Sequence, residues 1–347
     1  MKKTYLILLG VLVLALMLLP VLAGCGSSTT TTTAATTVTT APPSTETTAP
    51  ATTETTAPAG TTTTAAAATY DIKTVLAGIQ ADPAIKALLP TAMQTAGFKV
   101  ASDIPYPPWE MFVGDTSQPT GFDYDLSQAL AAKIGVKADF IETKFDSIIL
   151  SIQSGKNDVA MSDMYDNVAR QKVLDFVDYA NDGTSILVLK GNPKNVGGLD
   201  TLAGQAVGCE KGTTQAALLD SLNKQFQAAG KPAMTVNQYP DQPSVLLAIQ
   251  SGKIVGDLTD HSTAAYIANT TDNGATFEVV ADPAAPNGYE SQPVGAGVLK
   301  SNTGLRDAIQ KALQGLIDDG TYKTIIDHYG LLPVTAAQIN QGTASGA

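Results

Sequence analysis

The sequence predicts an α/β fold built from two similar lobes, and two observations indicate this class. Between residues 97 and 331, apolar runs typical of buried strands alternate with amphipathic segments typical of helices. The segment ILSIQSGK at residues 149–156 recurs as LLAIQSGK at residues 246–253, and each copy precedes an expected strand. Two copies of one strand–helix plan predict two α/β lobes.

The first 24 residues have the composition of a secretory signal peptide, because two lysines precede an apolar run over residues 5–23. Leu-Ala-Gly-Cys at residues 22–25 resembles the bacterial lipobox, in which the cysteine thiol receives a diacylglycerol. The resemblance implies removal of residues 1–24 and a lipidated Cys25 that anchors the chain to the bacterial cell membrane, outside the cytoplasm. A transmembrane helix is the alternative, because about 19 apolar residues can just span a bilayer.

Three further segments lie outside the two lobes. Residues 25–69 follow the signal and consist almost wholly of Thr, Ala, Pro and Ser, so we expect a disordered tether that buries too little apolar area to fold. Residues 70–96 carry apolar residues at helical spacing and predict an N-terminal extension of one or two short helices. Residues 332–347 are rich in Gln, Thr and Ala and predict a flexible tail.

The alternating pattern then defines the elements of each lobe in order. In the first lobe, we expect strands at residues 98–101, 136–142 and 158–161 and helices at residues 121–134 and 145–154. A strongly apolar strand follows at residues 183–189. In the second lobe, we expect strands at residues 206–208, 235–239 and 255–258 and helices at residues 214–228 and 244–250. Two last helices are expected at residues 305–317 and 321–328.

Composition excludes several classes of function. The 347 residues include 21 basic and 32 acidic side chains, and this net charge of −11 argues against a nucleic-acid partner. Two cysteines and two histidines leave little room for a metal site, and we expect no cofactor. The sequence contains no serine nucleophile elbow, no His-Glu-x-x-His and no Cys-x-x-Cys. An enzyme based on carboxylates stays open, because acidic residues are plentiful.

A series of motifs in a fixed order resembles one known family. Gly-Phe-Asp-Tyr-Asp-Leu at residues 121–126 looks like the signature of the family 3 bacterial extracellular solute-binding proteins. The other matching segments are residues 103–110, 152–158, 170–176, 212–215, 251–260 and 319–330. The resemblance implies the type II periplasmic binding protein fold, in which two mixed-sheet, Rossmann-like lobes are joined by a two-strand hinge. Lobe 1 is then expected at residues 97–182 and 294–331, and lobe 2 at residues 183–293.

The resemblance also implies an amino-acid site between the lobes. Arg170 matches the arginine that grips the ligand's α-carboxylate through a bidentate fork, which a lysine does not reproduce. Thr214 stands at a strand-to-helix turn, where a hydroxyl and free amides can hold the same carboxylate. Asp260 corresponds to the aspartate that binds the ammonium group. The plainer alternatives are a surface ion pair of Arg170 with Asp166 or Asp175, a simple helix cap at Thr214 and a solvated acid at Asp260.

The side-chain pocket of the family is matched with two departures. The matching positions are Asp103, Tyr106, Trp109 and Phe145. Simple core packing is the alternative for the aromatic residues. Asp163 and Tyr165 stand where the family usually has small or hydroxyl residues, and Asn167 replaces a usual threonine. An acid at position 163 repels a carboxylate unless it faces an ammonium or a cationic side chain, so the pocket favours a basic or polar ligand. A ligand other than a standard α-amino acid also stays open.

The function implied by the resemblance is capture of an amino acid for an ABC importer. Ligand binding stabilises a closed state, which the permease and its ATPase recognise. We expect a monomer without enzymatic activity. Two alternatives stay open. One is an enzyme of the cyclohexadienyl dehydratase type on the same scaffold, with Asp163 as the candidate general acid. The other is a receptor that presents the ligand to a signalling partner.

Overall fold

The computed structural model describes residues 70–345. The predicted signal peptide, the lipidated Cys25 and the tether lie outside the described residues. Within residues 70–345, no helix has the length and apolar character needed to cross a membrane.

The N-terminal extension forms three short helices where one or two were expected: α1 (Ile72–Gly78), α2 (Pro83–Lys86) and α3 (Thr91–Ala96). Asp71 and Asp82 explain two of the starts, because each carboxylate accepts hydrogen bonds from free amides of the first turn. Apolar residues of all three helices pack against the core of the first lobe. The extension is therefore part of the folded body.

Lobe 1 contains a parallel sheet with β1 (Phe98–Ser102) between β4 (Ala138–Glu142) and β5 (Val159–Ala160). Its helices are α4 (Phe122–Ile134), α5 (Phe145–Gln153), α9 (Thr303–Asp318) and α10 (Thr321–Tyr329). A small antiparallel pair, β2 (Met111–Phe112) and β3 (Pro119–Thr120), leads into α4. Because β1 and β5 are parallel, Asp103, directly after β1, and Ser162, two residues after β5, emerge at the same edge of the sheet, where ligands of α/β proteins bind.

Lobe 2 repeats this plan with β7 (Ala206–Glu210) between β8 (Thr235–Tyr239) and β9 (Asp257–Asp260), all parallel. Its helices are α6 (Thr214–Ala228), α7 (Gln242–Gln250) and α8 (His261–Thr270), and β10 (Phe277–Val279) adds an antiparallel strand. The sequence did not predict α8 and β10. The carboxyl ends of β7 and β9 bring Glu210 and Asp260 to the edge that faces lobe 1.

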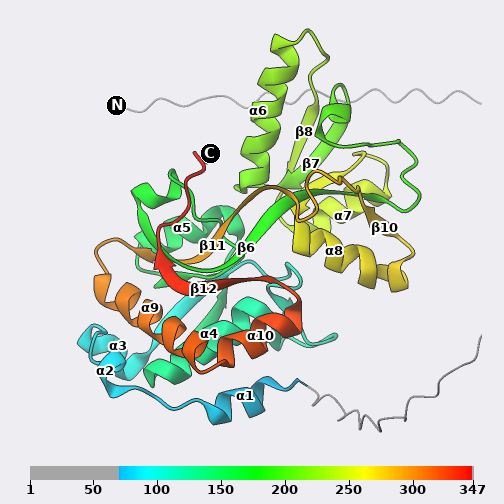
Figure 1. The fold of residues 1–347 in the computed structure, drawn as a ribbon. Coiled ribbons are helices and arrows are strands. Elements are labelled where there is room, and N and C mark those ends of the chain that lie inside the picture. The colour runs from blue at the N-terminus through cyan, green and yellow to red at the C-terminus, as the bar shows by residue number, and fades with distance from the viewer. Residues whose placement is uncertain (1–69, 346–347) are drawn as a thin grey trace, which may run out of the picture. The chain divides into compact units, whose positions relative to one another are not determined.

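Two long antiparallel strands join the lobes: β6 (Leu174–Leu189) and β11 (Tyr289–Leu299). In lobe 1, β11 pairs with β5, and in lobe 2, β6 pairs with β9, so one continuous sheet crosses both lobes. Figure 1 shows both strands running from one lobe into the other. Separate hydrophobic clusters form the interior of each lobe. The predicted fold class, with two mixed-sheet lobes and a two-strand hinge, is confirmed.

The chain after lobe 1 corrects one prediction. Residues 332–342 are not a flexible tail, because β12 (Leu332–Ile339) pairs antiparallel with β6. Beyond β12, the amide of Gly342 donates to Asp166 Oδ2 over 2.7 Å, and the amide of Gln341 donates to Asp178 Oδ2 over 3.0 Å. Backbone pairing and contacts with buried carboxylates hold this segment against the folded body. Its polar composition therefore wrongly predicted flexibility.

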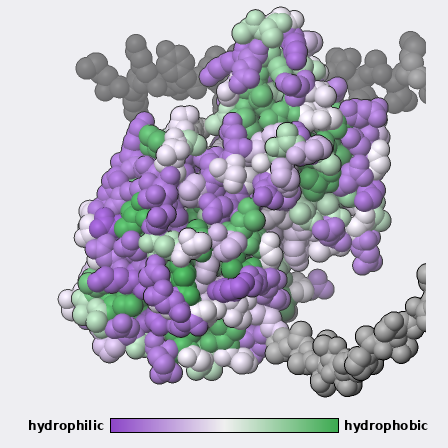
Figure 2. All heavy atoms as spheres, viewed as in Figure 1, coloured by the Kyte–Doolittle hydropathy of each residue, from purple (hydrophilic) through white to green (hydrophobic). Residues whose placement is uncertain are grey.

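The two copies of the repeated segment occupy equivalent helices, α5 in lobe 1 and α7 in lobe 2. Each copy exposes one leucine, with Leu150 67% exposed and Leu247 65% exposed. On the face drawn in Figure 2, hydrophobic residues form small groups among hydrophilic ones.

Cys209, in β7, is 0% exposed, and burial raises the pKa of its thiol. It is the only free cysteine within residues 70–345.

Candidate functional site

A cavity lies between the two lobes and encloses about 320 Å³ of empty space, including its opening. Of the site residues that the sequence predicted within residues 70–345, all except Trp109 line it. The structure adds Glu110, Ser162, Glu210, Thr213 and Gln215 to the lining. The cavity therefore brings these predicted residues together and is the candidate site.

Arg170 is buried at the start of a short 3₁₀ turn, Arg170–Lys172. Its Nη1 donates to the carbonyl of Tyr165 over 2.8 Å, and its Nη2 donates to the carbonyl of Gly212 in lobe 2 over 3.3 Å. The guanidinium lies 5.4 Å from the centre of the Phe145 ring. Burial lowers the pKa of Arg170 to about 10, against the opposing influence of Asp260 and Asp163, so the group is cationic at neutral pH.

The plainer alternative for Arg170 is wrong. Asp175 pairs with Lys300 at 2.7 Å and with Arg306 at 2.9 Å. Asp166 accepts from the side chain of Gln171 and the amide of Gly342. Among the residues that the structure describes, no carboxylate lies within ion-pair distance of the guanidinium. Arg170 is thus a cavity cation that can receive a carboxylate from a ligand.

Asp260 and Asp163 form one acidic end of the cavity. Asp260 ends β9, and its carboxylate accepts from Tyr106 Oη over 2.5 Å and from Gln215 Nε2 over 2.8 Å. Both carboxylate oxygens of Asp163 are buried without a hydrogen-bond partner among the described residues. Burial, and then the neighbouring Asp260, raises the pKa of Asp163. Asp163 therefore lies beside the acid predicted to bind an ammonium group.

The backbone at Asp163 is held in an unusual conformation. Its φ is 44°, in the left-handed region that non-glycine residues rarely adopt. The amide of Asp163 donates to Asp123 Oδ2 over 2.8 Å, which fixes this turn. Asp123 belongs to the signature at residues 121–126, and burial raises its pKa to about 7. The signature thus supports the site from behind, without lining the cavity.

Asp103 and Glu210 form a second acidic region, with one acid from each lobe. Asp103 follows β1, and its Oδ2 accepts from the amide of Phe145 over 2.9 Å while its Oδ1 lies 3.2 Å from Lys144 Nζ. Glu210 ends β7 and is buried, with Oε1 lacking a partner among the described residues. Burial, and then Asp103, raises the pKa of Glu210 to about 10. Glu210 was not among the residues predicted from the sequence, although an acid that ends an apolar strand was a usable signal.

The structure corrects the prediction for Trp109 and, for Thr214, only the helix-cap alternative. Trp109 does not line the cavity, because its ring is fully buried against Phe122 and its Nε1 donates to Ser262 Oγ over 2.8 Å. Core packing, the alternative, is correct for this residue. Thr214 is the first residue of α6, while the N-cap is Thr213. Within the part of the chain that the structure describes, no side chain caps the start of α6, so its first amides are free to meet an anion at the cavity.

Polar contacts join the two lobes across the cleft. Tyr106 of lobe 1 contacts Asp260 and Thr259 of lobe 2, and Lys211 Nζ lies 2.8 Å from Asp146 Oδ2. Lys144 lies between Asp103 and Asp241 of lobe 2. These contacts describe a closed arrangement, in which both lobes touch the same small space. Within residues 70–345, no group of His, Cys, Asp or Glu side chains is placed to hold a metal ion.

Two mixed-sheet lobes around a polar cleft define a protein that captures small solutes. The chain belongs to the bacterial extracellular solute-binding proteins, family 3, whose family model matches residues 98–331. The arginine-binding protein ArgT of Corynebacterium glutamicum is 30% identical over 260 residues, which cover 72% of this chain and 79% of that protein.

Solved structures agree with this assignment. An ancestral arginine-binding protein bound to arginine is 30% identical with a TM-score of 0.60, and the match covers 68% of this chain and 98% of that one. The ancestral amino acid-binding protein AncCDT-1, a precursor of cyclohexadienyl dehydratase, is 28% identical with a TM-score of 0.56, and the match covers 68% of this chain and 95% of that one.

Proposed function

We propose that this protein is the substrate-binding lipoprotein of an ABC importer and that it captures a basic amino acid. The observation that carries the proposal is the charge of the cavity. One cation, Arg170, is free of ion pairs among the described residues, and buried acids from both lobes surround it. A ligand with one carboxylate and two cations complements this arrangement, whereas an acidic amino acid leaves the buried acids without partners.

The roles follow from the positions of the charges. Arg170 and the amino end of α6 at Thr214 bind the α-carboxylate, and Asp260 and Asp163 bind the α-ammonium. The side chain of the ligand then lies between the rings of Tyr106 and Phe145 and extends toward Asp103. Tyr165 adds a buried hydroxyl near the ammonium. Carboxylate and ammonium are held mainly from opposite lobes, so binding favours closure.

Cys25 carries the lipid in this proposal, and residues 25–69 hold the folded body away from the membrane, outside the cytoplasm. The Leu-Ala-Gly-Cys sequence at residues 22–25 supports this assignment. The closed, liganded monomer is then delivered to the permease and its ATPase. A ligand-sensing receptor uses the same closure with a different partner.

A dehydratase is the second candidate, and one observation favours it. Burial, and then Asp260, raises the pKa of Asp163, which favours the protonated form of its carboxyl, and a protonated carboxyl can act as a general acid. The likeness to AncCDT-1, at 28% identity, points to the same alternative. Turnover of prephenate or arogenate by the wild-type protein would establish this activity.

Thermal unfolding in the presence of candidate ligands tests the proposal. The chain from Gly26 onward is mixed with arginine, lysine, glutamine, glutamate or agmatine, which is arginine without its carboxylate. A ligand at a hundred times its Kd stabilises the protein by about 2.7 kcal/mol. We expect arginine or lysine to raise Tm and agmatine to raise it much less, because Arg170 then lacks its partner. A rise in Tm with glutamate and with none of the other ligands contradicts the proposal.

A further inference from the structure

Two acids from opposite lobes meet across the cavity, and the proposed backbone contacts of the ligand use neither of them. Asp103 follows β1 in lobe 1, and Glu210 ends β7 in lobe 2. Glu210 is 5% exposed and its Oε1 has no hydrogen-bond partner among the described residues. A buried carboxyl oxygen without a partner is costly, so this position favours a ligand group that can satisfy it.

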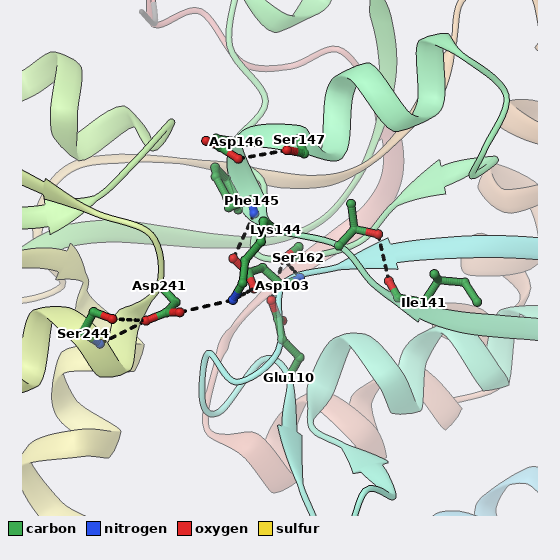
Figure 3. A network of polar contacts seen from close by, with 11 residues as sticks. Asp103, Glu110, Ile141, Lys144, Phe145, Asp146, Ser147, Ser162, Asp241 and Ser244 are labelled. Carbon is green, nitrogen blue, oxygen red and sulfur yellow. Dashed lines mark hydrogen bonds and ion pairs between the residues drawn. The ribbon is translucent and has the colours of Figure 1, made fainter. Parts of the chain in front are cut away.

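The nearby lysine balances Asp103 rather than Glu210. Figure 3 shows Lys144 directed toward Asp103 and Asp241. Its Nζ lies 3.2 Å from Asp103 and 3.3 Å from Asp241, and the side chain is 44% exposed. Asp103 also accepts from the amide of Phe145. Asp103 is therefore partly compensated by the protein, while no ion pair within the described residues compensates Glu210.

Closure of the lobes brings Glu210 against Asp103, and the energetic consequence depends on the ligand. Without a cation between them, the two acids repel or one must bind a proton. Burial first, and then Asp103, raises the pKa of Glu210. A cationic side chain placed between them removes the conflict. A neutral side chain of the same shape does not.

We propose that Glu210 determines specificity: together with Asp103 it binds the distal cation of the ligand's side chain, and it thereby makes lobe closure favour cationic over neutral amino acids. This inference rests on the proposed function and adds a residue of lobe 2 that selects the side chain. Because the two acids belong to different lobes, the distal cation links the lobes as the backbone groups of the ligand do.

Arginine and citrulline test the inference, because they have the same shape and differ in the charge of the distal group. Binding of both is measured by calorimetry for the wild type, for Glu210→Gln and for Glu278→Gln. Glu278 is the matched control, since it lies in lobe 2 outside the cavity and bonds to the amide of Gly191. Tm of each empty variant checks that it folds.

We expect Glu210→Gln to weaken arginine binding by about 10- to 100-fold, as loss of a hydrogen-bonded charge does. Citrulline binding should change by less than about threefold, and Glu278→Gln should alter neither. An equal loss of both ligands, or no loss of arginine, overturns the role of Glu210 while the proposed function stands. If the wild type binds neither arginine nor lysine, the proposed function fails and this inference fails with it.

Discussion

Replacing Gly342 by alanine should detach the C-terminal segment from the loop that carries Arg170. A Cβ atom at this position would lie 2.0 Å from the carbonyl oxygen of Asp166. Rotation of a side chain cannot relieve a clash with backbone, so the segment must move. The movement breaks the bond from the Gly342 amide to Asp166 Oδ2 and the bond from Gln171 Nε2 to the Gly342 carbonyl.

The expected loss in the free energy of unfolding follows from these two hydrogen bonds. The one to a carboxylate contributes about 1.5–3 kcal/mol and the neutral one about 0.5–1.5 kcal/mol. The bond to Asp166 is buried and the bond from Gln171 is partly buried. Detachment of the segment admits water to the freed groups, so we expect the lower end of the summed range, about 2 kcal/mol. For a domain of this size, that lowers Tm by about 4–8 °C.

Differential scanning calorimetry of the empty protein measures the effect. Gly78→Ala is the matched control, because no atom lies within 4 Å of its added Cβ. Its Tm should not fall and should rise by at most about 4 °C, since alanine stabilises a helix by about 0.5–1 kcal/mol relative to glycine. An unchanged Tm for Gly342→Ala refutes the packing of this segment on residues 166–171.

Three other changes test the charges of the site and of the core. Arg170→Lys keeps the charge but loses the fork, so arginine should bind about 10- to 100-fold more weakly while agmatine binding changes little, as measured by calorimetry. Lys211→Met removes an exposed ion pair with Asp146 across the cleft, and the affinity for arginine should fall by less than about fivefold. A larger loss means that this pair controls closure. Asp257 is fully buried, accepts from Gln242, and has its pKa raised by burial from 3.8 to about 7. The folded state therefore binds this proton more tightly than the unfolded state, so the stabilisation is complete below about pH 4 and is lost as the pH rises to about 7. Asp257→Asn should flatten the fall in urea midpoint between pH 5 and pH 8 and raise the midpoint at pH 8, and an unchanged slope refutes this assignment.

Apolar periodicity predicted the elements whose stability comes from side-chain burial. The helix expected at residues 214–228 is α6 with the same bounds, and the strand at residues 235–239 is β8. Both carry regular apolar positions between clear turn signals. Strands β11 and β12 were missed because their pairing with β6 depends on backbone bonds in a sequence rich in Gly, Gln and Pro. Their register is a tertiary property that local composition does not carry.

The site residues also divide into those that a sequence motif marks and those that only the folded structure brings together. Arg170, Asp260 and Asp103 were placed by motif spacing, and the structure brings them to one cavity. Glu210 was missed because its importance depends on Asp103, which is distant in the sequence and reaches it only when both lobes are folded and closed. Trp109 was misplaced for the opposite reason: its motif lies beside the cavity, but its ring points into the core.

The burial of Cys209 makes lobe motion accessible to single-molecule fluorescence. The sequence has two cysteines, so a chain that starts at Gly26 has one thiol, and that thiol is shielded and slow to ionise. Maleimide dyes would therefore react selectively with new cysteines at Leu150 and Leu247, the exposed leucines of the two repeated helices. Energy transfer between these dyes would record each opening and closing event in a polypeptide otherwise unchanged.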